Sequence, residues 1–213
     1  MPGRLYDATW GRAFAWGCDW FQRRSCDAGM EERRRELLSR ARGRTIEIGS
    51  GTGINLEHYG PEVTELVLSE PDPHMMRRLR AKVDSSSRPA EVVQAPAGEL
   101  PFGDSSFDTA TLVYVLCTVP DVEAALAEIA RVLRPGGRLL FLEHVRSPDP
   151  GLARWQDRLH GPWFLFGNGC HCNRDTVAAI EGSGLALEDL ERDEIPKAPP
   201  IVRPMVVGSA RAK

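Results

Sequence analysis

The stretch Thr45-Ile46-Glu47-Ile48-Gly49-Ser50-Gly51-Thr52-Gly53-Ile54-Asn55 decides how the rest of the chain is expected to fold. An apolar, strand-like lead-in is followed by three alternate glycines, which let the backbone turn sharply and approach a ligand closely. The dinucleotide fingerprint G-x-G-x-x-G would place its third glycine at position 54, where this chain has Ile54. The stretch therefore predicts a cofactor loop that differs from the dinucleotide-binding loop.

From Arg44 onward, strand and helix patterns alternate, which is typical of a parallel sheet covered by helices on both faces. We expect strands at 44–48, 64–70, 90–94, 107–114 and 137–144, and helices near 53–59, 73–83, 121–134 and 173–183. The tail adds two strand candidates, Leu185-Ala186-Leu187 and Met205-Val206-Val207, joined by a proline-rich segment without a helix. Two such strands pair most simply antiparallel at the sheet edge. The sequence thus predicts an α/β fold.

The first 42 residues are expected to form a helical cover. In Tyr6 to Phe21, aromatic residues recur four apart; this spacing fits a helix packed on the core edge, a cover over a ligand site, or a membrane-surface helix. A second helix is expected from Asp27 through Arg42, with a buried stripe of Met30, Leu37 and Leu38 and with Gly43 as its stop. Its Arg33-Arg34-Arg35 run, bracketed by glutamates, is expected on a solvated face.

Composition limits the class of protein. A chain of 213 residues with a formal charge of −3 is expected to be a single domain and not a general nucleic-acid binder. Its five cysteines form no disulfide framework, and neither a signal peptide nor an apolar run long enough for a bilayer is apparent. We therefore expect a cytoplasmic protein without an integral membrane segment, as a monomer or homodimer.

Ligands of an open parallel sheet bind beyond the carboxyl ends of its strands, near the point where the strand order reverses. Glu70 ends the second strand, about twenty residues past Gly49, where a carboxylate can accept from two ribose hydroxyls. The alternative is an ordinary strand-end carboxylate. After the third strand, the small residues Ala97 and Gly98 would let backbone amides meet an adenine edge.

These residues resemble the class I S-adenosylmethionine-dependent methyltransferases, in particular the branch of the ubiquinone and menaquinone methyltransferases. The resemblance covers positions 44 to 144. It rests on the motif from Glu47 to Gly53, on Glu70, on Leu100-Pro101-Phe102 with Phe107-Asp108, and on Ala130-Arg131-Val132-Leu133-Arg134-Pro135-Gly136-Gly137. It implies a Rossmann-like, seven-stranded, mostly parallel sheet with an antiparallel C-terminal strand, and S-adenosyl-L-methionine as the cofactor.

A closer resemblance extends into the C-terminal part. Val115-Leu116-Cys117-Thr118-Val119, Phe141-Leu142-Glu143-His144-Val145, Gly169-Cys170-His171-Cys172 and the Arg203-Pro204 and Val207-Gly208 pairs look like the methyltransferase-like 7, or thiol methyltransferase 1, family. That family methylates small thiols and carries an N-terminal membrane anchor. We expect no anchor in this chain, and the resemblance implies S-methylation of a small-molecule thiol.

The resemblance also implies roles for residues around the cofactor. Gly49, Gly51 and Gly53 would approach its methionine portion, Glu47 would help hold the amino group, Glu70 would bind the ribose, and Ala97 and Gly98 would lie beside the adenine. The remaining cofactor-binding candidates are Ser50, Thr52, Asn55, Pro71, Val113 and Tyr114. The implied division of the chain is a cover at 1–42, a cofactor-binding core at 44–145, a lid insertion at 146–172, and a helix with edge strands at 173–213.

Methyl transfer from a sulfonium needs the acceptor held in line, and a thiol acceptor benefits from a base. His144, at the carboxyl end of the fifth strand, is the nearest candidate base, because imidazole exchanges protons near neutral pH; the alternative is a histidine that only positions a loop. The segment 148–166, interrupted by Gly151, Gly161 and Pro162, predicts a lid over the acceptor. The candidate substrate-binding residues are Tyr6, Cys117, Trp155, His160, Trp163 and His171.

Cys170-His171-Cys172 has one residue between its cysteines and no second pair at a suitable spacing, so no metal site is expected and pocket lining or packing is favoured. Two other functions stay open. One is methylation of an amine, phospholipid or quinone precursor on the same fold. The other is a nucleotide-binding module without chemistry or an NAD-dependent enzyme, which Gly53 and Ile54 disfavour.

Overall fold

The structure is a computed structural model, and it describes residues 29–167 and 169–213. The aromatic segment Tyr6 to Phe21, with the candidate residue Tyr6, lies outside the described residues. Among the described residues, no helix is both long and apolar enough to cross a bilayer.

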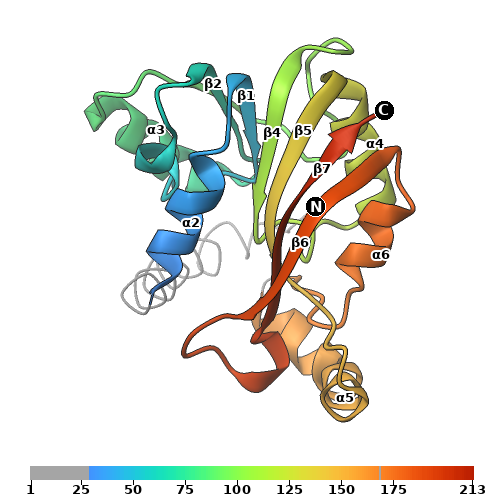
Figure 1. Cartoon of the computed structure of the whole chain (residues 1–213). Coiled ribbons are helices and arrows are strands. Elements are labelled where there is room, and N and C mark those ends of the chain that lie inside the picture. The colour runs from blue at the N-terminus through green and yellow to red at the C-terminus, as the bar shows by residue number, and fades with distance from the viewer. Residues whose placement is uncertain (1–28, 168) are drawn as a thin grey trace.

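A seven-stranded sheet with the strand order β3-β2-β1-β4-β5-β7-β6 forms the centre of the molecule (Figure 1). The strands are β1 Gly43–Ile48, β2 Val63–Ser69, β3 Glu91–Val93, β4 Phe107–Val113, β5 Leu133–His144, β6 Leu185–Glu194 and β7 Pro204–Ala212. The pairs among β1 to β5 are parallel, whereas β7 runs antiparallel to both β5 and β6. The predicted α/β sheet with an antiparallel last strand is confirmed, and its strand order reverses between β1 and β4.

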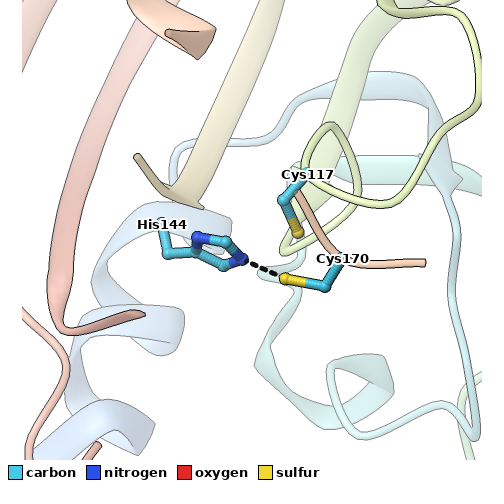
Figure 2. A group of neighbouring side chains, drawn as sticks. All are labelled: Cys117, His144 and Cys170. Carbon is cyan, nitrogen blue, oxygen red and sulfur yellow. Dashed lines mark hydrogen bonds between the residues drawn. The ribbon is translucent and has the colours of Figure 1, made fainter. Parts of the chain in front are cut away.

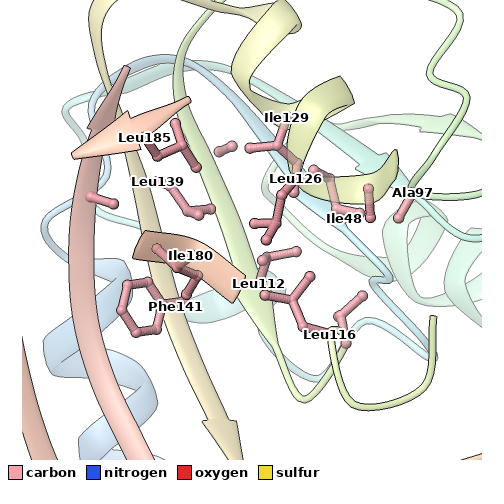
Figure 3. Packing of buried hydrophobic residues seen from close by; sticks show 14 of the residues in the cluster. Ile48, Ala97, Leu112, Leu116, Leu126, Ile129, Leu139, Phe141, Ile180 and Leu185 are labelled. Carbon is pink, nitrogen blue, oxygen red and sulfur yellow. The ribbon is translucent and has the colours of Figure 1, made fainter. Parts of the chain in front are cut away.

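Helices cover both faces of this sheet. They are α2 Glu31–Leu38, α3 Pro73–Ser85, α4 Val122–Val132, α5 Pro150–Phe166 and α6 Thr176–Glu181, with 3-10 turns η3 Leu56–His58 and η4 Pro200–Val202. Alternate residues of β5 point to opposite faces, so Leu139 and Phe141 pack in one apolar core while Leu140 and Leu142 pack in the other. Figure 3 shows the first core, where Leu126 and Ile129 lie against the sheet.

The helix expected at 53–59 is reduced to the single turn η3. Gly51 and Gly53 keep positive φ angles of 57° and 83°, which a right-handed helix cannot contain. A helical turn can therefore begin only after Asn55. The glycines that identify the loop also shorten the helix that follows it.

The boundary between α4 and β5 also differs from expectation. The helix expected at 121–134 ends at Val132, and β5 begins at Leu133 instead of at position 137. The register of β5 against β4 shifts between Phe107 and Thr109, and Gly136 within the strand has a φ of 79°. Pro135 and Gly136 thus form an irregular strand start and not a loop.

The segment expected as a broken lid is a continuous helix, α5, that runs through Pro162. Asp149 caps its start by accepting from the Leu152 amide, and Pro150 occupies the first turn, where no amide donor is needed. Gln156 anchors the helix from a fully buried position, since its Nε2 donates to the carbonyl oxygens of Val145 and Cys172 at 3.1 and 2.9 Å. Gly151, Gly161 and Pro162 therefore do not interrupt the segment, contrary to the sequence expectation.

Helix α2 confirms its expected buried stripe but corrects one residue of its charged face. Met30, Leu37 and Leu38 are buried as predicted, whereas Arg34 is only 2% exposed although it was expected in solvent. Arg34 lies four residues after Met30 and three before Leu37, so it shares their face of the helix. The run of charged residues around Arg34 favoured an exposed helix face, although the spacing of Arg34 from Met30 and Leu37 indicates the buried face.

Candidate functional site

The glycine loop between β1 and η3 is held close to the sheet by backbone contacts. Gly49 and Gly51 have φ angles of 68° and 57°, and the Ser50 amide donates to the Ser69 carbonyl at 2.9 Å. A Cβ on Gly49 would lie 2.6 Å from Val115 Cγ2, whereas a Cβ on Gly51 would meet no protein atom within 4 Å. Gly49 therefore serves packing against the sheet, and Gly51 faces open space that a ligand can fill.

Glu70, directly after β2, reaches the same loop. Its Oε2 accepts from the Gly51 amide at 2.8 Å, and its Oε1 accepts from the Asp72 amide at 2.9 Å. Burial raises the pKa of Glu70, and the two backbone hydrogen bonds oppose this shift. The carboxylate predicted from its sequence spacing thus lies at the loop, at the carboxyl edge of the sheet. Pro71, the next residue, is exposed.

Glu47 lies beneath the loop in a buried polar network. Its Oε1 accepts from Asn55 Nδ2 at 2.8 Å, its Oε2 accepts from the Tyr59 hydroxyl at 2.7 Å, and Asn55 Oδ1 accepts from Arg34 at 2.7 Å. Burial is the largest cause that raises the pKa of Glu47, and burial with the nearby Glu47 raises that of Tyr59. Both carboxylate oxygens of Glu47 are used inside the protein, so the network fixes the loop through Asn55.

The other cofactor candidates surround this loop in different ways. Ala97 is buried and Gly98 is exposed after β3, while Val113 is buried at the end of β4. Tyr114 adopts a φ of 58°, and the Arg34 guanidinium lies 5.5 Å from the centre of its ring. Ser50 is buried and Thr52 is half-buried within the loop itself. These candidates lie beyond the carboxyl ends of β1, β3 and β4, along one edge of the sheet.

Three side chains from distant segments converge at that same edge (Figure 2). Cys117 follows β4, His144 ends β5, and Cys170 follows α5. His144 Nε2 and Cys170 Sγ are 2.9 Å apart, and the two sulfurs and one ring nitrogen all lie within 4.8 Å of one another. All three residues are buried. We refer to this group as the Cys117–His144–Cys170 cluster.

The cluster adjoins the cofactor loop through the turn that carries Cys117. Val115, two residues before Cys117, is the side chain that contacts Gly49. Glu143 Oε1 accepts from the amides of Val115 and Leu116 at 2.7 and 3.0 Å. Arg174 donates to the carbonyl oxygens at the other end of this turn, at 2.8 Å for Val119. The turn is therefore fixed from two sides.

The buried groups of the cluster have perturbed titration. Hydrogen bonding from Cys117, supported by His144, holds the pKa of Cys170 well below its usual range, while the same contact and burial raise the pKa of Cys117. Burial raises the pKa of Glu143 to about 7 against its backbone hydrogen bonds. The contact between the two cysteines thus shifts their thiol pKa values in opposite directions.

The remaining acceptor-side candidates divide into near and distant residues. Trp163 Nε1 donates to Cys170 Sγ at 3.1 Å, and the His171 amide donates to the Cys117 carbonyl at 2.8 Å. His160 Nε2 and His171 Nδ1 are 2.9 Å apart, and burial lowers the pKa of His171. Trp155, in contrast, is 57% exposed, so the structure does not bring it to His144.

Sequence reasoning missed three residues of this site. Cys170 was considered only together with Cys172, although Cys172 hydrogen-bonds to Gln156 and takes no part in the cluster. Glu143 had a detectable signal, since a carboxylate inside an otherwise apolar strand needs buried partners. Arg34 had the helical spacing described above. The meeting of Cys170 with His144 had no local signal.

Comparisons with known proteins agree with this geometry. Residues 46–141 match the family model described as a methyltransferase domain. Thiol S-methyltransferase TMT1B of Homo sapiens is 33% identical over 193 residues, covering 85% of this chain and 79% of that protein. The ubiquinone/menaquinone biosynthesis C-methyltransferase UbiE of Dinoroseobacter shibae is 35% identical over 125 residues, covering 57% of this chain and 50% of its own.

Solved structures show the same fold. An SAM-dependent methyltransferase from Methanosarcina mazei superposes with a TM-score of 0.66 at 20% identity, covering 83% of this chain and 95% of that chain. The open space at Gly51 and the carboxylate of Glu70 beside it fit the nucleoside cofactor of such enzymes. The chain therefore belongs to the S-adenosyl-L-methionine-dependent methyltransferases, in a family with the thiol S-methyltransferases.

Proposed function

We propose that the protein transfers the methyl group of S-adenosyl-L-methionine to the sulfur of a small-molecule thiol. The observation that carries this proposal is the extent of similarity to thiol S-methyltransferase TMT1B, which covers 85% of the chain. The similarity to the C-methyltransferase UbiE covers 57%. The similarity to the thiol S-methyltransferase therefore extends over a larger part of the chain than the similarity to the C-methyltransferase.

On the cofactor side, the loop and the strand ends would hold S-adenosyl-L-methionine. The sulfonium supplies an activated methyl group, and a correctly placed nucleophile displaces it without further activation. The proposed contacts are the backbone at Gly49, Gly51 and Gly53 for the methionine portion, Glu70 for the ribose, and Ala97 with Gly98 for the adenine. Glu47 would support the loop indirectly, because one of its carboxylate oxygens accepts from Asn55 and the other accepts from Tyr59.

On the acceptor side, the Cys117–His144–Cys170 cluster would meet the incoming thiol. His144 is the base expected from the sequence, but its Nε2 already contacts Cys170 Sγ at 2.9 Å. An acceptor at this edge therefore encounters a group of two sulfurs and an imidazole instead of a free base.

Turnover of matched acceptor panels tests the proposal. Purified protein is incubated with S-adenosyl-L-methionine and one acceptor at a time, and S-adenosylhomocysteine is quantified. The acceptors are small alkyl thiols, aryl thiols, amines, phosphatidylethanolamine and a hydroquinone. We expect product only with the thiols, identified by mass spectrometry as the methyl thioether. Preferential methylation of nitrogen or carbon would contradict the proposed acceptor. The cytoplasmic location and the monomeric or dimeric state expected from the sequence stay predictions.

A further inference from the structure

The Cys117–His144–Cys170 cluster combines the ligand types that structural and catalytic zinc sites use. Zinc prefers thiolate and imidazole ligands in a tetrahedron, and catalytic zinc sites keep one of the four positions open for water or substrate. Two cysteines and one histidine make three such ligands, and their donor atoms all lie within 4.8 Å of one another. We infer that Cys117 Sγ, His144 Nε2 and Cys170 Sγ bind one zinc ion, whose fourth position takes the sulfur of the acceptor thiol.

The distances are close to those of a zinc site. With Zn–S of about 2.3 Å and Zn–N of about 2.0 Å, neighbouring ligand atoms of a tetrahedron lie about 3.5 to 3.8 Å apart. His144 Nε2 and Cys170 Sγ, at 2.9 Å, would have to separate by roughly 0.6 Å to reach the nitrogen-to-sulfur spacing. A change of this size needs only small rotations of two side chains.

A cation would also compensate the buried Glu143 carboxylate, one oxygen of which lacks a partner among the described residues. Within the part of the chain that the structure describes, His144 Nδ1 and Glu143 Oε2 are buried and have no hydrogen-bond partner. Buried polar atoms without partners are costly. The charge of a divalent ion bound to His144 Nε2 would stabilise the nearby Glu143 carboxylate.

The backbone around the three ligands is already held in place by hydrogen bonds. The three side chains are therefore positioned for a metal ion before it binds. Glu143 holds the turn before Cys117, and the His171 amide holds the Cys117 carbonyl at 2.8 Å. Trp163 Nε1 donates to Cys170 Sγ at 3.1 Å, which is the kind of outer contact that orients a metal-bound thiolate. Cys172, whose thiol hydrogen-bonds to the Gln156 carbonyl, is excluded from the cluster and offers a matched control.

The chemical step rests on the proposed function. The acceptor R–SH binds the open position as a thiolate, and its proton leaves to solvent. The thiolate sulfur then forms a bond to the methyl carbon while the bond from that carbon to the cofactor sulfur breaks, with the electron pair going to the cofactor sulfur. The product R–S–CH₃ is neutral and a weak ligand, so it leaves the metal, and oxidation states do not change.

Metal content is the first test. The full chain is purified with reductant, incubated with a small excess of Zn²⁺, passed through a desalting column and analysed for bound zinc. We expect about one equivalent in the unaltered protein and in Cys172→Ser, and at least a tenfold lower content in Cys117→Ser and Cys170→Ser. Far-UV circular dichroism establishes that each variant is folded. Unaltered protein without stoichiometric zinc, or with Cys117 and Cys170 joined as a disulfide, overturns the inference.

Cobalt substitution is the second test, and it does not depend on turnover. Co²⁺ in place of Zn²⁺ should give the strong visible absorption of a tetrahedral thiolate site, and a thiol acceptor should change that spectrum where the matching alcohol does not. A spectrum insensitive to thiol overturns the open position. If metal-free protein methylates thiols at the full rate, the metal site is refuted and the proposed function stands. If a thiol changes the cobalt spectrum but is not methylated, the metal site stands and the proposed function is refuted.

Discussion

The two halves of the carboxyl edge of the sheet are built differently. In the cofactor half, residues 43–70, the main contacts join near neighbours: Asn55 and Glu47 are 8 residues apart, and Glu70 and Gly51 are 19 apart. In the acceptor half, which is the Cys117–His144–Cys170 cluster with α5, the ligand-like atoms come from three separate segments, and His144 and Cys170 are 26 residues apart. The cofactor half is thus a local motif, whereas the acceptor half exists only after folding.

This difference separates the cofactor half, which other methyltransferases can share, from the acceptor half, which can differ between them. A local motif can be kept while the segments around it change, and similarity to UbiE covers 57% of the chain. A cluster assembled from distant segments depends on the relative position of β4, β5 and α5. We expect changes in the cofactor half to abolish binding of S-adenosyl-L-methionine, and changes in the acceptor half to spare it.

The largest effect on cofactor binding is expected from Gly51→Asn. Asparagine tolerates a positive φ such as the 57° of Gly51, and a Cβ there meets no protein atom within 4 Å. The chain should therefore fold normally while the new side chain fills the ligand space. We expect affinity for S-adenosyl-L-methionine to fall at least about 100-fold, or roughly 2.7 kcal/mol, by isothermal calorimetry. Unchanged affinity in a folded variant would show that the cofactor lies elsewhere.

A large loss of stability is expected from Arg34→Ala. Removing this buried cation leaves Asn55 Oδ1 without its donor at 2.7 Å and the Glu47 carboxylate without its nearest charge. Loss of one buried partner typically costs about 3 kcal/mol, which urea unfolding would measure. Arg35→Ala, on the exposed side of the same helix, is the matched control and should change stability by less than about 0.5 kcal/mol. Equal effects of both substitutions would refute the role of the network.

Glu143 gives a pH-dependent prediction for the acceptor half. Its folded-state pKa of about 7 lies above the ordinary value, so folding favours the protonated form. This contribution is fully present below the unfolded pKa and is lost as the pH rises through about 7, by about 3 kcal/mol. In metal-free protein, Glu143→Gln should flatten the dependence of unfolding free energy between about pH 4.5 and 7. Parallel curves for both proteins would contradict it.

The smallest effect is expected from Trp155→Ala. Its indole is 57% exposed and contacts Arg158 at 5.9 Å from the ring centre. Unfolding free energy should change by less than about 0.5 kcal/mol, and the KM for a thiol acceptor should stay within about twofold. Trp163→Phe, which removes the donor to Cys170, is the comparison that should raise that KM. A larger effect at Trp155 than at Trp163 would reverse the assignment of the acceptor side.

The contrast between the halves also explains how far the sequence predicts the structure. The loop glycines are recognised by their alternate spacing, which the backbone conformation of the loop requires. Glu70 is recognised by its position at the end of a strand. The directions of the strands follow from the alternation of strand and helix and from the helix-free tail. These features were predicted because each is determined by residues close together in the chain.

The features that were not predicted depend on tertiary contacts. Pro162 does not break α5, because buried Gln156 holds the helix through several carbonyl groups. Arg34 is buried because Asn55 and Glu47 supply polar partners that only the folded loop provides. Cys170 lies beside His144 because of where α5 packs on the sheet. The spacing of cysteines in the sequence does not indicate this packing. Propensity and motif spacing cannot report such contacts.

The burial of Arg34 has a thermodynamic consequence for α2. The helix and the cofactor loop share one network, so opening α2 removes the support of Asn55 and weakens cofactor binding. Linkage requires the reverse to hold by the same factor: bound cofactor must disfavour opening of α2. Amide hydrogen exchange in Glu31–Leu38 would then slow in proportion to cofactor occupancy. A short N-terminal helix thus becomes a reporter of the occupied state.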